Sequence, residues 1–172
     1  GTGVSPVGAV AQASRLWVQW HRRLACGCSG TGVSPVGAVA QASRLWVLMR
    51  VKSPSTFSLT VERSKFHALL TPLSSAAEME ALLKTRRRDY RKANHHCWAF
   101  RLTDASGTLV EQSKDDGEVG HPGRVLLELL RKHDLEGALL VSRIFGGVKL
   151  GVGGVSRAFR DAGQGAINVY LN

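Results

Sequence analysis

The sequence predicts an α+β fold in which a mixed or antiparallel sheet is covered on one face by helices. Candidate elements follow in the order strand, strand, helix, strand, strand, helix, strand, helix, and short turns join several strands, which is typical of such a sandwich. The chain has 172 residues, enough for one domain with its own core. No run of 18 apolar residues occurs, so no membrane-spanning helix is expected.

The first half of the predicted domain contains two strands and a helix. Residues 57–61 and 65–70 have strand character, with a polar turn between them. Residues 75–78 (SAAE) form a capping-box pattern, and the apolar residues that follow have helical spacing. The end of this helix, residues 84–92, is crowded with cations. Such a run is usually a solvated face, but in a basic chain it is also a candidate phosphate contact.

The second half contains a hairpin, a helix, a strand and a closing helix. Residues 97–102 and 108–112 are the predicted strands of the hairpin. Pro122 suits the first turn of the next helix, and an apolar stripe follows it. Residues 138–145 are largely apolar, as expected for a buried strand, and a glycine-rich segment then leads into the last helix.

The chain is strongly basic, with 23 Lys and Arg against 13 Asp and Glu and a formal charge of +10. A basic excess of this size favours polyanionic partners such as RNA, DNA or ribosomes, although it determines no fold. Three cysteines are too few for a disulfide framework, so a reducing, cytoplasmic setting is expected.

Residues 1–48 differ in composition from residues 49–172, and we expect them to be a poorly structured tail rather than a domain. Residues 1–18 recur unchanged as residues 30–47. Four explanations stay open: a recent duplication, upstream DNA translated from a misplaced start with Met49 the true first residue, a targeting peptide, or a metal site at Cys26-Gly27-Cys28.

Two segments carry candidate chemistry. Asp115, Asp116 and Glu118 surround one glycine, a pattern that fits a divalent-cation site, a carboxylate with a raised pKa, or simply a turn whose acids cap the following helix. Between the last strand and the last helix, backbone N–H groups and nearby cations fit an anion site, with tight chain crossing as the alternative. The residues concerned are Gly146, Gly147, Lys149, Gly151, Gly153, Gly154, Arg157 and Arg160.

A third candidate is His95-His96-Cys97, in which only His95 and Cys97 can share one face of a strand. A nucleophilic cysteine needs a base and an orienting group, and the sequence does not reveal them. A buried structural cysteine is therefore the favoured interpretation, and the catalytic residues stay unknown.

These motifs, taken in order, resemble the YigZ/IMPACT family. The resemblance rests on HHCWAFR from His95, DDGE from Asp115, Gly123-Arg124, and RIFGGVKLGVGGVSRA from Arg143, and it runs from about residue 57 to residue 167. It implies a ribosomal protein S5 domain 2-like fold in a cytosolic protein linked to translation control. Eukaryotic members oppose activation of a kinase of an initiation factor by competing for its ribosome-associated activator, whereas bacterial members have no firmly assigned activity.

The chain departs from the family pattern in its spacing and in its extent. Only Val119-Gly120-His121-Pro122 separates DDGE from Gly123, which resembles eukaryotic members, while the segment from Gly151 resembles bacterial ones. With an end at Asn172, the ferredoxin-like second domain of bacterial members is not expected. No eukaryotic-type RWD domain precedes the match, so the eukaryotic partner mechanism is not transferred.

The sequence therefore favours a nucleic-acid- or ribosome-binding module in translation regulation. RNA or the ribosome is the expected partner, a protein of the translation machinery is another, and neither a cofactor nor a metal is expected. An enzyme acting on a phosphorylated small molecule and a protein-interaction module without catalysis are the alternatives. The expected phosphate contacts are Arg143, Lys149, Arg157 and Arg160, flanked by Arg124 and the cationic run at residues 86–92.

Overall fold

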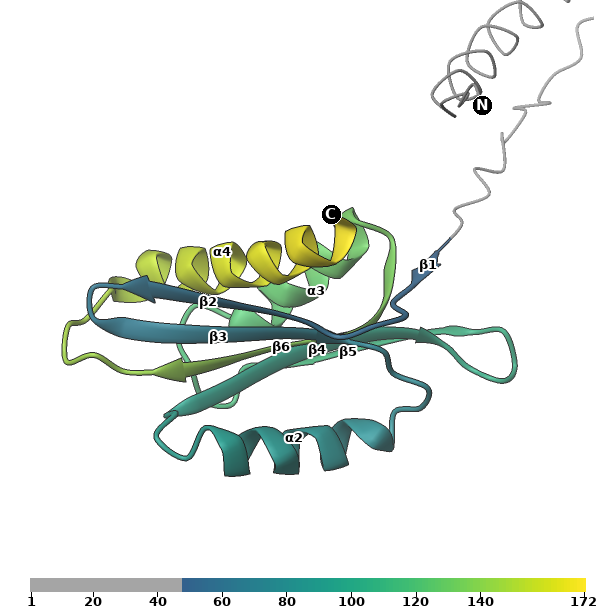
Figure 1. Ribbon diagram of the computed structural model, residues 1–172, viewed down its shortest axis with the longest axis horizontal. Coiled ribbons are helices and arrows are strands. Elements are labelled where there is room, and N and C mark those ends of the chain that lie inside the picture. Colours follow the sequence, from purple (N-terminus) through teal and green to yellow (C-terminus); the bar gives the residue numbers. More distant parts are fainter. Residues whose placement is uncertain (1–47) are drawn as a thin grey trace, which may run out of the picture. The chain divides into compact units, whose positions relative to one another are not determined.

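The computed structural model describes residues 48–172, so the predicted tail lies outside the described residues. Six strands and three helices make up this part of the chain (Figure 1). The strands are β1 (Met49–Arg50), β2 (Ser55–Val61), β3 (Ser64–Thr71), β4 (His95–Thr103), β5 (Leu109–Lys114) and β6 (Leu135–Ile144). The helices are α2 (Glu78–Asp89), α3 (Pro122–Lys132) and α4 (Gly151–Leu171).

The sheet is antiparallel apart from one short pairing. Its strand order is β2-β3-β6-β4-β5, and β1 adds a two-residue parallel pairing to the start of β6. The β2–β3 hairpin turns through Glu62 and Arg63, both with positive φ, a conformation that matches the right-handed twist of a tight hairpin. The predicted α+β class and the predicted hairpins are therefore confirmed.

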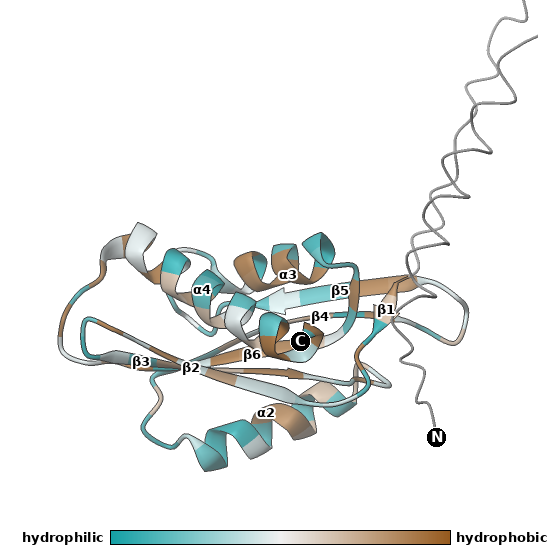
Figure 2. Cartoon of the chain, turned by 45° about the horizontal axis from the view of Figure 1, so that its top comes forward, coloured by the Kyte–Doolittle hydropathy of each residue, from teal (hydrophilic) through white to brown (hydrophobic). Residues whose placement is uncertain are grey.

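Helices cover both faces of the sheet, whereas the sequence predicted that they cover one. Figure 1 shows α3 and α4 on one side and α2 on the other. Alternation along β4 explains this arrangement, because Cys97 and Ala99 belong to the core beneath α3 and α4, while Phe100 and Leu102 form a second core with Met79 of α2. Figure 2 shows that hydrophobic and hydrophilic residues are interspersed along the helices, and the buried residues of α3 and α4, such as Leu126 and Phe159, belong to the core beneath these helices.

Two predictions about the helices are confirmed, and the prediction of a capping box is wrong. Pro122 opens α3 as expected, and the apolar face of α4 beginning at Val155 is buried as expected. The capping box is wrong: α2 begins at Glu78 with Ala77 at the cap position and no side-chain cap. The Glu78 carboxylate instead accepts a hydrogen bond from the backbone N–H of Ser74 at 2.9 Å.

Within residues 48–172, no helix combines the length and apolarity needed to cross a membrane.

Candidate functional site

Sheet topology brings the three sequence motifs to one end of the molecule. The start of β4 pairs with the ends of β5 and β6, with Trp98 opposite Lys114 and His95 opposite Arg143. The acidic loop follows β5 and the glycine-rich segment follows β6. Both loops therefore leave the sheet beside the beginning of β4, where the His95-His96-Cys97 motif lies.

The three acidic side chains of the loop point to three different partners. Asp115 accepts a hydrogen bond from the backbone N–H of Gly123 at 2.7 Å and so stabilises the first turn of α3. Asp116 accepts one from the backbone N–H of His96 at 2.8 Å. No three His, Cys, Asp or Glu side chains in the described part of the chain are arranged to hold a metal ion. The turn-and-cap interpretation therefore accounts for Asp115.

Glu118 and Arg143 form a buried ion pair. The Arg143 Nη1 donates to the Glu118 Oε2 at 2.5 Å, and the Arg143 and Glu118 side chains are only 7% and 4% exposed. The Arg143 charge is therefore paired inside the protein rather than free at the surface, and its contact with a polyanion stays a prediction. Strand alternation points Arg143 inward, toward the same face as Val141, and the motif pattern does not reveal that a carboxylate lies there.

Cys97 lies in the core beneath α3 and α4, as a structural cysteine would. Its thiol donates to the backbone carbonyl of Asp115 at 3.0 Å. Burial, reinforced by the negative charge of Glu118, raises the pKa of Cys97 far above its ordinary value, so the thiolate is disfavoured. His95 lies on the same face of β4, and its Nε2 is 3.8 Å from the Glu118 carboxylate.

The glycines of the motif serve two different purposes. At Gly146 a Cβ would overlap the backbone of Arg63, so the chain crosses the β2–β3 turn at a distance that only glycine permits. At Gly147, Gly151 and Gly153 a Cβ would meet no atom within 4 Å, so these residues border open space. At Gly154 a Cβ would contact only the Leu150 side chain, at 3.2 Å. Tight chain crossing thus explains Gly146 but not the glycines that begin α4.

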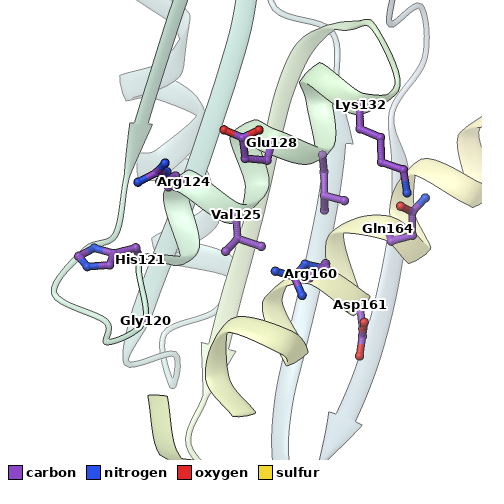
Figure 3. Close-up of a pocket in the computed structure, with 10 residues that line it drawn as sticks. Gly120, His121, Arg124, Val125, Glu128, Lys132, Arg160, Asp161 and Gln164 are labelled. Carbon is purple, nitrogen blue, oxygen red and sulfur yellow. The ribbon is translucent and has the colours of Figure 1, made fainter. Parts of the chain in front are cut away.

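Four of the predicted cations are exposed and have no acidic partner among the described residues: Arg124, Lys149, Arg157 and Arg160. Arg124 of α3 and Arg160 of α4 border one groove, with a volume of about 520 Å³ (Figure 3). Glu128 and Asp161 also line this α3–α4 groove, so its charge is mixed.

A second cavity, here named the α4 pocket, lies where the three motifs meet. Its volume is about 360 Å³. It is lined by Asn94 and His95 at the start of β4, by Val119 of the acidic loop, and by residues on either side of the β6–α4 connection. The latter are Arg143, Phe145, Lys149, Leu150, Gly151, Val152 and Val155.

The cationic run of α2 lies on the opposite face of the sheet from α3 and α4. The prediction that this run flanks the other cations is therefore wrong. Arg86 is buried, and its Nη2 donates to the backbone carbonyl of His67 at 2.7 Å. The Arg87 Nη2 lies 3.5 Å from the Asp116 Oδ1, and the Arg88 Nε lies 3.6 Å from the Asp89 Oδ1. The run therefore serves partly to attach α2 to the sheet.

The sequence interpretation missed the apolar side chains at the rim of the α4 pocket. Phe145 was predicted as the end of a buried strand, but β6 ends at Ile144 and Phe145 is 44% exposed. Val119 and Val152 are 52% and 61% exposed. The hydrophobicity of these three residues by itself predicts that they are buried. They reach the surface because Phe145 and Val119 lie in connecting loops and Val152 lies at the start of α4.

Comparison with known proteins identifies the relatives of this chain. Residues 62–167 match the family model of the Impact N-terminal domain. The chain is 30% identical over 120 residues to IMPACT family member YvyE of Bacillus subtilis (strain 168), covering 69% of this chain and 54% of YvyE. It is 40% identical over 100 residues to an IMPACT family member in the pol 5′ region of Thermus thermophilus, covering 58% and 52%.

One solved structure, described as a hypothetical protein, has a TM-score of 0.63 and 26% identity to this chain. That similarity covers 67% of this chain and 57% of the other. The chain spans about half the length of the curated relatives it matches.

Proposed function

Because the chain belongs to the Impact N-terminal domain family, we propose that it is an RNA- or ribosome-binding module that acts in translation regulation. The family assignment confirms the resemblance read from the motifs and supports the link to translation. The observation that carries the binding proposal is the set of exposed cations without acidic partners on α3, α4 and the segment before α4, within the described residues. Partners among the proteins of the translation machinery belong to the same proposal.

The spacing of these cations suits a phosphate backbone. Arg157 and Arg160 are three residues apart on α4, so their side chains emerge from neighbouring turns on one side of the helix. Arg124 borders the same groove as Arg160, across from it on α3. Cations on two adjacent elements can neutralise successive phosphates and release their counterions, which makes the affinity dependent on salt.

The proposal is tested by reversing charge on one face at a time. Arg157→Glu plus Arg160→Glu changes the α4 face, and Lys84→Glu plus Arg91→Glu makes the same charge change on the α2 side. We expect the α4 variant to bind single-stranded RNA at least about tenfold more weakly at low salt, with a salt slope about 1.4 smaller, since each lost phosphate contact removes about 0.7. Fluorescence anisotropy across a salt titration measures both quantities.

The α2 variant is the matched control and is expected to keep most of the affinity. Equal losses in both variants would show that net charge alone attracts RNA and that no face is specific. No RNA binding by the wild-type chain at low salt would overturn the proposal.

An enzyme acting on a phosphorylated small molecule is the second candidate, favoured by the cavity that joins the acidic loop to the glycine-rich segment. Only Val119 of that loop lines the cavity, however, and each of the three carboxylates already accepts a hydrogen bond from the protein. Among the side chains that line the cavity, the His95 imidazole is the candidate general acid or base. The geometry therefore supports binding more strongly than catalysis.

A further inference from the structure

The α4 pocket has a cationic wall at the N-terminus of α4. The cap residue Leu150 supplies no side-chain hydrogen bond to the first N–H groups of this 21-residue helix. Gly151 and Gly153 lie in the first turn and carry no side chains to cover it. Lys149, which directly precedes the cap, also lines the pocket and adds a full positive charge to the partial charge of the helix end.

Arg143 is an independent sign that a ligand completes this pocket. Its side chain is more than nine-tenths buried and lines the cavity, yet its Nε has no hydrogen-bond partner among the described residues. Glu118 neutralises the charge through the Nη1 but does not itself line the cavity. The buried Nε is not accessible to a ligand, but the Nη2 also makes no hydrogen bond among the described residues, and it is the donor that an anion in the pocket would meet.

The lining of the pocket also includes apolar side chains and one exposed aromatic ring. Phe145 lines the cavity, and the Arg143 guanidinium carbon lies 5.5 Å from the centre of its ring. Val119 and Val152 also line the pocket and are exposed. An aromatic ring next to a group of cations matches the two parts of a nucleotide, since a base stacks on the ring while the phosphate meets the cations.

We propose that the α4 pocket binds one unpaired nucleotide, with its phosphate at the N-terminus of α4 beside Lys149 and its base against Phe145. A volume of about 360 Å³ lies within the range of small-ligand sites. The nucleotide is either free or part of a single strand. In the second case the inference rests on the proposed RNA binding, and the pocket adds a preference for single-stranded over duplex RNA.

The test compares single-stranded oligo-uridine, a duplex RNA of equal length and free AMP, each added to the full chain. Phe145→Ala removes the stacking surface, and Leu109→Ala truncates another exposed apolar residue, on β5, as the matched control. We expect Phe145→Ala to weaken single-strand binding by about 5- to 160-fold, the loss typical of one base stack, and to leave duplex binding unchanged. AMP is expected to shift the backbone amide NMR signals of Gly151 and Gly153.

The outcomes separate this inference from the proposed function. RNA binding that depends on Arg157 and Arg160 but is unaffected by Phe145→Ala, without amide shifts from AMP, overturns the pocket and leaves the RNA-binding face intact. Amide shifts from AMP that Phe145→Ala abolishes, without RNA binding by the wild-type chain, support the pocket as a free-nucleotide site and overturn the proposed function. Shifts produced by an acidic peptide and not by AMP identify a different ligand class and overturn the inference.

Discussion

At the scale of single residues, the Glu118–Arg143 pair links two of the motifs. Glu118 comes from the acidic loop and Arg143 from the end of β6, and their pairing holds the loop against the sheet. His95 lies beside the same carboxylate. The pair thus holds Arg143 in place where it lines the α4 pocket.

Removing the carboxylate of this pair should destabilise the protein strongly. Glu118→Ala leaves the Arg143 guanidinium buried without a counterion, and we expect the free energy of unfolding to fall by about 3–5 kcal/mol. Glu128→Ala is the control, because it breaks an exposed pair with Arg131 and should cost less than about 1 kcal/mol. Urea denaturation at neutral pH measures both, and similar losses would show that the buried pair contributes little.

At the scale of elements, α4 combines two kinds of glycine in one helix. Gly163 is buried where α4 packs on α3 and the sheet, and a Cβ there would lie 2.9 Å from Leu129 and 3.0 Å from Leu126. Gly153 lies in the first turn and borders open space. The first glycine sets the distance between two helices, while the second leaves the N-terminus of α4 accessible.

Alanine at these two glycines should therefore have different effects. Both substitutions replace glycine by a better helix former, so the stability gained from helix propensity is similar in the two variants and largely cancels when they are compared. Overpacking against the buried leucines should make Gly163→Ala less stable than Gly153→Ala by about 1–3 kcal/mol. Thermal and urea denaturation of the two variants measure this difference. Equal stabilities would contradict the close packing of α4 on α3.

At the scale of the whole molecule, α2 and the sheet enclose two histidines. His67 of β3 and His96 of β4 both lie opposite Ser142 of the central strand β6, one on each side of it. The His96 Nδ1 lies 2.9 Å from the Ser142 hydroxyl. Burial lowers the pKa of both histidines, and the charge of Arg86 on α2 acts in the same direction.

The lowered pKa values predict that acid weakens the fold. Between the ordinary histidine pKa of 6.5 and the lower folded-state pKa, the unfolded chain binds protons that the folded chain does not. The free energy of unfolding should therefore fall as the pH drops from neutral through this window. Below the folded-state pKa, the contribution of the two histidines to this free energy no longer changes with pH. His96→Asn and His67→Asn should each flatten the dependence, as measured by urea denaturation between about pH 7.5 and about pH 5. A slope unchanged by both variants would contradict the prediction.

Much of the fold was predictable because hydrophobic periodicity is a local property. Apart from the two-residue β1, which the sequence did not predict, the strand and helix order, the two hairpins and the inward face of α4 follow from spacing alone. The placement of α2 did not, because its apolar side is compatible with either face of the sheet. Only the second core, where Met79 packs against the even-numbered residues of β4, decides the face.

The sequence by itself determined the element order, the family and the basic character of this protein. The tertiary structure decided which charges are available. Arg143 is neutralised by a carboxylate 25 positions away in the chain, Arg86 is buried against the sheet, and Lys149, Arg157 and Arg160 form no ion pair within residues 48–172. It also brought Phe145 to the surface beside the N-terminus of α4. The physical reason is that periodicity depends on neighbours in the chain, whereas ion pairing and burial depend on which distant segments the sheet brings together.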